Sequence, residues 1–298
     1  KQNDPERAKQ ELEKAFALDE TDARVLLELD QLYKKLGMPF EKRLELYESH
    51  KDIITERDDV MLEYVTLYNL AGKPEKAYEI IMSDSFRPWE GAEGRISGQY
   101  KIALLEMAKK DIAAGAYSEA EEKLEKALVY PENLGEGKLE GTKDNNLYYY
   151  LGLVKEALGK EGAEECFHLA ELGDNEPAGA MYYYDQPADM ILYKGLAKQK
   201  LGKTKEAHAC FNKLMDYGER HLNDVVKNDF FAVSLPDFLI FEDDMDKRNK
   251  AHCYYLMGLA NLGMGQKEKA VEEFDKALEY DFNHQNCRIY KELAKGEL

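Results

Sequence analysis

The chain has 298 residues, of which 44% are hydrophobic and 34% are charged, a composition that supports a folded core and excludes a disordered chain. A net charge of −18 would repel phosphate backbones and anionic membranes, so we expect neither nucleic acid nor a membrane as a partner. No run of about 18 apolar residues is present, so no transmembrane helix is predicted.

The four cysteines form neither a CxxC motif nor a spacing typical of Cys/His metal ligands. Cys166 and Cys210 each precede a Phe in segments that look equivalent, which predicts a small buried residue at a recurring packing position. We therefore expect no disulfide, no metal site and no cofactor. Reduced thiols, and a sequence that does not open on a signal peptide, favour a cytoplasmic protein.

The N-terminal part of the chain is predicted to consist of helical hairpins. Residues 6–19 carry the apolar spacing of a second hairpin helix without its first helix (Ala8, Leu12 and Ala15). The open end of a helical array needs a cap, so we expect this chain to be a fragment of a longer protein. Two weaker hairpins follow at 23–56 and 58–83. Each has a Tyr on its first helix and a Gly at its turn: Tyr33 with Gly37, and Tyr68 with Gly72.

Two loop segments further along the chain resemble each other. PWEGAEGRISG (88–98) and PENLGEGKLEG (131–141) share the pattern P-x4-E-G-[RK]-[IL]-x-G. The alignment places Glu93 opposite Glu136 and predicts two equivalent loops, side by side at one edge of the array. We expect the only tryptophan, Trp89, to lie against this pair and against a helix over 99–114. Both glutamates should then point toward a groove, with Arg95 and Lys138 offsetting their charge.

The C-terminal half repeats one spacing of small and aromatic residues. Gly258, Ala270, Phe274 and Ala277 show it most clearly: a Gly where two helices touch, then A-x3-F-x2-A on the second helix. This is the tetratricopeptide repeat (TPR) pattern. Other copies are Ala120 with Leu124 and Ala127, Gly152 with Ala163, Phe167 and Ala170, and Gly195 with Ala207 and Phe211.

The recurring pattern predicts an all-α fold, a TPR-type α-solenoid in which at least twelve helices form a right-handed superhelix of hairpins. We expect a single domain over 1–298, with 284–298 as a capping helix. Long loops should be inserted at about 84–98, 130–146, 173–188 and 217–249. The last insert contains FFAVSLPDFLIFEDD, which is apolar enough to pack against the array.

The inserted loops have two interpretations that the sequence leaves open. Their aromatic residues either fill gaps in an irregular solenoid or, with neighbouring polar side chains, line a ligand pocket on the concave face. The TPR register also places first-helix residues on that face, Asn146 among them. The candidate ligand-binding residues are Trp89, Glu90, Glu93, Arg95, Tyr100, Glu132, Asn133, Glu136, Lys138, Tyr149, Tyr183, Asp185, Gln186, Asp189, His252 and Tyr255.

The motifs PWEGAEG, YPENLGEGK, AMYYYDQPADM and FAVSLPDFLIFEDD resemble the C-terminal region of a family of large bacterial proteins. In that family a TPR array follows a β-rich, mutarotase-like N-terminal region of unknown function. The resemblance covers nearly the whole chain. It implies that the missing N-terminal portion is the natural partner, and it implies a link to carbohydrate metabolism. It transfers no catalytic residues.

Two functions remain open at this stage. The first is a non-enzymatic scaffold that docks the protein's own N-terminal domains or a protein partner. A clamp for chaperone tails is excluded, because Leu27, Leu62 and Leu105 occupy the matching positions. The second is a module that recognises or processes carbohydrate, for which Glu93 and Glu136 could serve as paired carboxylates. We expect no catalysis by this fragment alone, since the sequence contains no nucleophile motif or phosphate loop.

Overall fold

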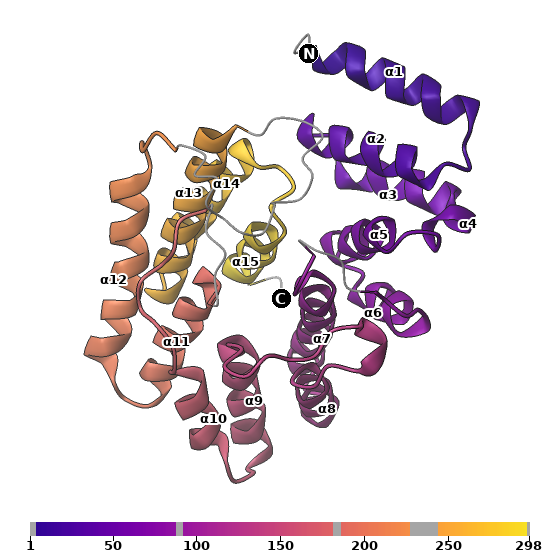
Figure 1. Ribbon diagram of the computed structural model, residues 1–298. Helices are drawn as coiled ribbons and strands as arrows, with labels where there is room; N and C mark the ends of the chain where they lie inside the picture. The colour runs from indigo at the N-terminus through magenta and orange to yellow at the C-terminus, as the bar shows by residue number, and fades with distance from the viewer. Residues whose placement is uncertain (1–3, 88–91, 181–185, 227–243, 297–298) are drawn as a thin grey trace. The chain divides into compact units, whose positions relative to one another are not determined.

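The computed structural model describes residues 4–87, 92–180, 186–226 and 244–296 (Figure 1). These residues form fifteen α-helices and one short 3-10 helix, with no β-strand among them. The all-α prediction is therefore confirmed. No helix in these ranges is long and apolar enough to cross a membrane. Most of the apolar stretch of the fourth insert lies outside the described residues.

Contacts divide the chain into two compact units. The described residues of the first unit are 4–87, 92–103 and 131–137. Its helices are α1 (Pro5–Leu18), α2 (Ala23–Lys35), α3 (Phe40–Ser49), α4 (Lys51–Ile54), α5 (Asp58–Leu70), α6 (Pro74–Ser83), the start of α7 (Arg95–Ala113) and the 3-10 helix η1 (Glu132–Leu134).

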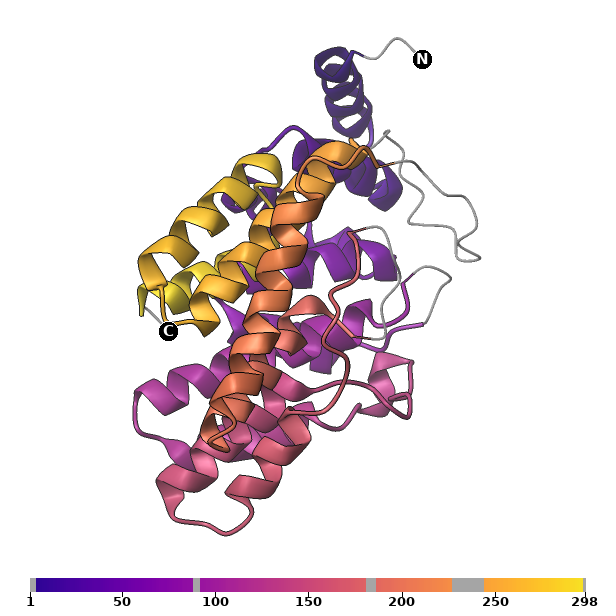
Figure 2. The ribbon, with the colours of Figure 1, turned by 90° about the vertical axis from the view of Figure 1, so that its left-hand side faces the viewer.

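The second unit contains the described residues 104–130, 138–180, 186–226 and 244–296. Its helices are the rest of α7, then α8 (Tyr117–Ala127), α9 (Asn145–Leu158), α10 (Ala163–Ala170), α11 (Ala188–Lys200), α12 (Thr204–His221), α13 (Met245–Gly263), α14 (Lys267–Tyr280) and α15 (Gln285–Lys295). Consecutive helices from α8 to α15 are neighbours, and Figures 1 and 2 both show α12, α13 and α14 side by side.

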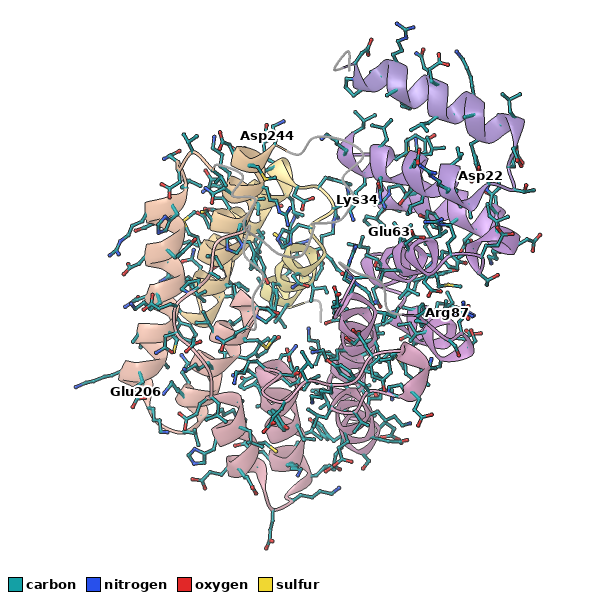
Figure 3. All side chains as sticks on the ribbon, in the orientation of Figure 1. Asp22, Lys34, Glu63, Arg87, Glu206 and Asp244 are labelled. Carbon is teal, nitrogen blue, oxygen red and sulfur yellow. The ribbon has the colours of Figure 1, made fainter. Side chains whose placement is uncertain are left out.

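Short polar side chains and glycines set the helix boundaries. Asp22 accepts hydrogen bonds from the backbone N–H groups at the start of α2, and Asp244 caps α13 in the same way (Figure 3). Glycine at each hairpin turn adopts a left-handed conformation, as at Gly37 (φ 70°) and Gly72 (φ 66°). Both turns were predicted from sequence, because a residue with a Cβ is strained in this conformation.

The TPR signature is visible as direct contacts in the second unit. The first-helix glycines Gly152, Gly195 and Gly258 each lie against the aromatic ring of the following helix. A Cβ built on Gly258 would lie only 2.4 Å from Cε1 of Phe274. The small residue therefore permits the close approach of α13 and α14. These contacts confirm a TPR-type array.

Cys166 and Cys210 are buried free thiols, as predicted from their place before the second-helix aromatic. Burial raises the pKa of both thiols, because the thiolate form loses its hydration. Both residues are therefore part of the core.

Candidate functional site

The two matching loops meet in the first unit. The backbone N–H of Gly94 donates to Oε2 of Glu136 at 2.8 Å, and that of Ser97 donates to Oε1 at 3.1 Å. The predicted proximity of the loops is confirmed. The carboxylate of Glu136, however, caps the N-terminus of α7, where a negative charge is favourable. Both carboxylate oxygens of Glu136 are thus engaged by the chain itself, and its place at a ligand groove stays a prediction.

Asn133 also has a structural task in this loop. Its side-chain amide donates to the carbonyl oxygens of Ile81 (2.7 Å) and Asp84 (2.8 Å), at the end of α6. Its own carbonyl oxygen accepts from the N–H of Phe86 at 2.8 Å. The loop 131–137 is thereby fixed to its unit by both side-chain and backbone bonds.

The other candidate residues of these loops differ in how far they are exposed to solvent. Glu93 and Glu132 are exposed, whereas Tyr100 is buried and packs near the ring of Tyr78 at 6.0 Å. Burial raises the pKa of Tyr100 to about 12. Trp89 and Glu90 lie outside the described residues, so the predicted packing of Trp89 stays a prediction.

Arg95 belongs to a row of polar residues on α2, α5 and α7 of the first unit. Its Nη2 lies 3.5 Å from Oε1 of Glu63 on α5, and Nζ of Lys34 on α2 lies 3.5 Å from Oε2 of the same carboxylate (Figure 3). The Glu63 side chain is 9% exposed, whereas those of Lys34 and Arg95 are 39% and 36% exposed. One buried carboxylate is thus flanked by two half-exposed cations.

Two amide side chains continue this row of polar residues. The Asn69 amide on α5 donates to Oε1 of Gln99 on α7 at 2.8 Å and to the Gln99 carbonyl oxygen at 3.1 Å. Oδ1 of Asn69 is buried without a hydrogen-bond partner in the described part of the chain. We use the name polar seam for Lys34, Glu63, Asn69, Arg95 and Gln99.

A buried ion pair between α2 and α3 lies next to the polar seam. Arg43 on α3 binds both oxygens of Asp30 on α2, and its Nη2 also lies 3.4 Å from Oε2 of Glu63. Burial acts to raise the pKa of Glu63, but Lys34, Arg43 and Arg95 together lower it to about 2. Glu63 is therefore ionised across the physiological range. Three cations therefore lie around the two buried carboxylates.

The first helices of the second unit carry a tyrosine cluster instead. Tyr149 packs against the rings of Tyr150, Phe167 and Tyr193, with centroids 5.6, 6.1 and 5.7 Å away. Burial raises the pKa of Tyr149 to about 12. Its ring is partly buried and packs against the core of this unit, and its place on a groove stays a prediction.

The C-terminal helix α15 adds Tyr290 to this cluster. The Tyr290 hydroxyl donates to Oδ2 of Asp189 on α11 at 2.8 Å, and its ring lies 6.1 Å from that of Tyr255 on α13. All three side chains are buried. Asp189 and Tyr255 were predicted to face a groove, but α15 packs beside α13 and α14 and encloses them.

Sequence reasoning missed the buried charged pair of Glu106 and Lys109 in this unit. Nζ of Lys109 on α7 donates to Oε1 of Glu106 at 2.6 Å and lies 5.5 Å from the centre of the Tyr150 ring. Both charged side chains are buried. Burial acts to lower the pKa of Lys109, but Tyr150, Glu106 and Asp189 raise it, so the lysine stays charged. Only the i, i+3 spacing of Glu106 and Lys109 could have suggested their pairing.

The remaining predicted residues of the second unit contact other parts of the same unit. Nε2 of His252 lies 2.9 Å from the carbonyl oxygen of Ala178, and burial lowers the pKa of His252 to about 4. Gln186 exchanges two hydrogen bonds with the backbone of Asp174, at 2.8 and 2.9 Å. Lys138 pairs with Asp144 at 2.6 Å.

Tyr183 and Asp185 lie outside the described residues. Among the residues that are described, no group of three or more His, Cys, Asp or Glu is arranged to hold a metal ion. The geometry therefore offers polar and aromatic contacts for binding. In the polar seam, to which the predicted residue Arg95 belongs, two cations remain partly exposed beside a buried carboxylate.

No protein-family model matches the chain. A tetratricopeptide repeat protein from Parabacteroides merdae is 18% identical, with 98% of this chain and 93% of that chain covered at a TM-score of 0.43. YrrB, a TPR protein with an unusual peptide-binding site, is 17% identical, with 88% and 100% covered at a TM-score of 0.28. Cut9 with Hcn1, from the APC/C, gives 13% identity, 96% and 46% coverage and a TM-score of 0.38. The assignment to a TPR-type fold rests on the contacts between the first-helix glycines and the second-helix aromatic rings within the chain itself.

Proposed function

We propose that the chain is a non-enzymatic interaction scaffold that binds a segment of a protein partner, or of the protein's own N-terminal domains, at the polar seam. The observation that supports this proposal is the partial exposure of Lys34 and Arg95 beside a buried carboxylate. Both are more than a third exposed, and both flank the buried carboxylate of Glu63. Because both side chains are partly exposed, a protein partner can reach them.

The settings of Glu93 and Glu136 do not favour the carbohydrate alternative. Glycoside hydrolysis needs two carboxyl groups that both face the sugar. Glu136 is engaged by the backbone of α7, and Glu93 is exposed. The scaffold proposal requires neither of them as a catalyst.

Site-specific photo-crosslinking tests the proposal. A photoreactive residue replaces Gln31, which lies three residues before Lys34 and so on the same side of α2. A control carries it at Glu79, which is exposed on the second helix α6. Each variant is incubated with the purified N-terminal region of the protein and, separately, with cell extract.

We expect a defined adduct from position 31 and none from position 79. Reversing both seam cations, with Lys34→Glu and Arg95→Glu, should abolish the adduct. Equal labelling from both positions, or an adduct that survives the charge reversal, would contradict binding at the polar seam.

A further inference from the structure

We infer that the second unit contains a separate binding site for a segment of a protein partner, formed by side chains of α11, α12 and α13, and that residues 173–178 of the chain occupy this site as an internal ligand. We call residues 173–178 the strap, and the side chains that hold it, Lys194, Lys213 and His252, the strap site. The inference goes beyond the proposed function, because it concerns the other unit and a different ligand.

The backbone of the strap is bound by side chains of the helices. The Gly173 carbonyl oxygen accepts a hydrogen bond from Nζ of Lys194 on α11. The Ala178 carbonyl oxygen lies 2.9 Å from Nε2 of His252 on α13, and Nε2 must be the donor because a carbonyl oxygen only accepts. Within the described ranges, no strap residue makes a backbone–backbone hydrogen bond. The strap is therefore held as a bound peptide is held, by side chains of other elements rather than by regular secondary structure.

The side chains of the strap indicate which segment fits the site. Glu176 is exposed and pairs with Nζ of Lys213 on α12, alongside which the strap runs in Figure 1. The next residue, Pro177, is buried. A partner segment with the dipeptide Glu-Pro would reproduce both contacts, and the fixed φ of proline reduces the entropy that such a segment loses on binding. We therefore assign the site to a protein segment that contains Glu-Pro.

Two features favour displacement of the strap by such a partner. Lys194 is only 7% exposed, and no carboxylate in the described part of the chain forms an ion pair with it. Burial lowers the pKa of Lys194, because its ammonium group loses hydration, and a neutral carbonyl oxygen offsets this loss less well than a carboxylate does. Pro177 is also the one strap residue that is buried, and segments with few buried apolar contacts open at a low cost in free energy.

The test uses a fluorescein-labelled peptide with the sequence of residues 172–180, LGDNEPAGA, called the strap peptide. A control peptide has Gln and Ser in place of Glu and Pro. The chain variant Glu176→Gln, Pro177→Ser carries the same two changes in its own strap and leaves the strap site intact. Fluorescence anisotropy measures the affinities. We expect the strap peptide to bind this variant at least about tenfold more tightly than the wild type, whose tethered strap competes at a high effective concentration. The control peptide should bind neither protein measurably.

Substitutions in the strap site, made in the same variant, should weaken binding of the strap peptide. His252→Phe removes the donor to the Ala178 carbonyl but keeps a ring, so we expect a loss of about fivefold or more. His252→Gln keeps an N–H donor and should bind more tightly than His252→Phe. Lys213→Met should weaken binding about two- to fivefold, since it removes an exposed ion pair. Lys205→Met is the matched control, because Lys205 is an exposed lysine of the same helix, and it should leave the affinity unchanged.

Thermal unfolding verifies that each variant is folded. If the variant with the altered strap does not fold, Gln186→Ala takes its place, because it leaves the strap sequence intact and removes the two hydrogen bonds that fix Asp174. Equal affinity of the strap peptide for the wild type and the folded variant would overturn the inference. So would equal binding of the two peptides, or no binding to any variant. The residues of the polar seam all lie in the first unit, so none of these outcomes affects the proposed function.

Discussion

Arg43 holds Asp30 through two parallel hydrogen bonds, from Nε to Oδ1 and from Nη2 to Oδ2, each 2.7 Å long. Asp30 lies seven residues before the turn glycine Gly37, just as Gly258 lies seven residues before Gly265. The first complete hairpin therefore has an aspartate where the clearest TPR copy has its contact glycine. A buried ion pair replaces the close approach of small residues.

The first prediction concerns the ion pair of Asp30 and Arg43. Arg43→Met leaves the buried carboxylate of Asp30 without its cation, so we expect a loss of roughly 3–5 kcal/mol in the free energy of unfolding. The triple variant Asp30→Gly, Arg43→Ala, Tyr47→Phe restores residues of the TPR pattern, and also removes the Tyr47 hydroxyl that donates to Asp30. It should be clearly more stable than Arg43→Met alone. Urea unfolding measures both, and equal losses in the two variants would show that the ion pair is not the source of the effect.

The structure shows which features of this chain the sequence could predict. The contact of Gly258 with Phe274 follows from a fixed spacing within one hairpin, and the meeting of the matching loops follows from their shared pattern. Both depend on neighbours whose geometry the repeat itself sets.

The burial of Asp189 could not be predicted from the repeat pattern. Its register places it on a first helix, but its burial depends on Tyr290, 101 residues away in the chain. Likewise the loop alignment predicted that Glu136 lies beside the other loop, but not that its oxygens reach the backbone of α7. A pattern gives the face of a helix on which a residue lies, whereas the partner that covers it comes from tertiary packing.

A second prediction concerns the contact glycines. Gly258→Ala introduces a Cβ that would clash with the ring of Phe274, so we expect a loss of about 1–3 kcal/mol in the free energy of unfolding. Gly98 is the matched control, because it is helical and a Cβ built there has no atom within 4 Å. Gly98→Ala should be neutral or slightly stabilising, since alanine favours the helix. Thermal unfolding of both variants checks this, and equal destabilisation would contradict the steric argument.

A third prediction follows from the lowered pKa of Glu63. Its folded-state pKa of about 2 lies below the ordinary value of 4.5, so its contribution to stability is complete above pH 4.5 and is lost as the pH falls toward 2. Glu63→Gln should therefore be less stable than the wild type at pH 7, by on the order of 2–3 kcal/mol. The difference should shrink steadily below pH 4.5. Urea unfolding across this range measures it, and a difference that does not depend on pH would contradict the ionised state of Glu63.

The fourth prediction concerns His252, which is buried as a neutral ring. Its folded-state pKa of about 4 lies below the ordinary value of 6.5, because burial disfavours the charged form. The unfolded chain therefore binds more protons between these values, so the contribution of His252 is complete above pH 6.5 and falls as the pH approaches 4. Wild type should lose on the order of 2 kcal/mol more than His252→Gln between pH 7 and pH 4.5. Parallel pH profiles in the two proteins would count against the burial of His252 as a neutral ring.

The last prediction separates the capping role of Glu136 from a role in ligand binding. Glu136→Ala removes both acceptors at the start of α7, so we expect a loss of about 1 kcal/mol in the free energy of unfolding and faster hydrogen exchange at the amides of Gly94 and Ser97. Glu136→Gln should lie between this variant and the wild type, because an amide oxygen still accepts a hydrogen bond but no longer places a negative charge at the helix N-terminus. Glu132→Ala, at an exposed site in the same loop, should change neither quantity measurably. If the Glu136 variants keep wild-type exchange at both amides, the carboxylate is not bound there in solution, and Glu136 would again be a candidate to face a ligand together with Glu93.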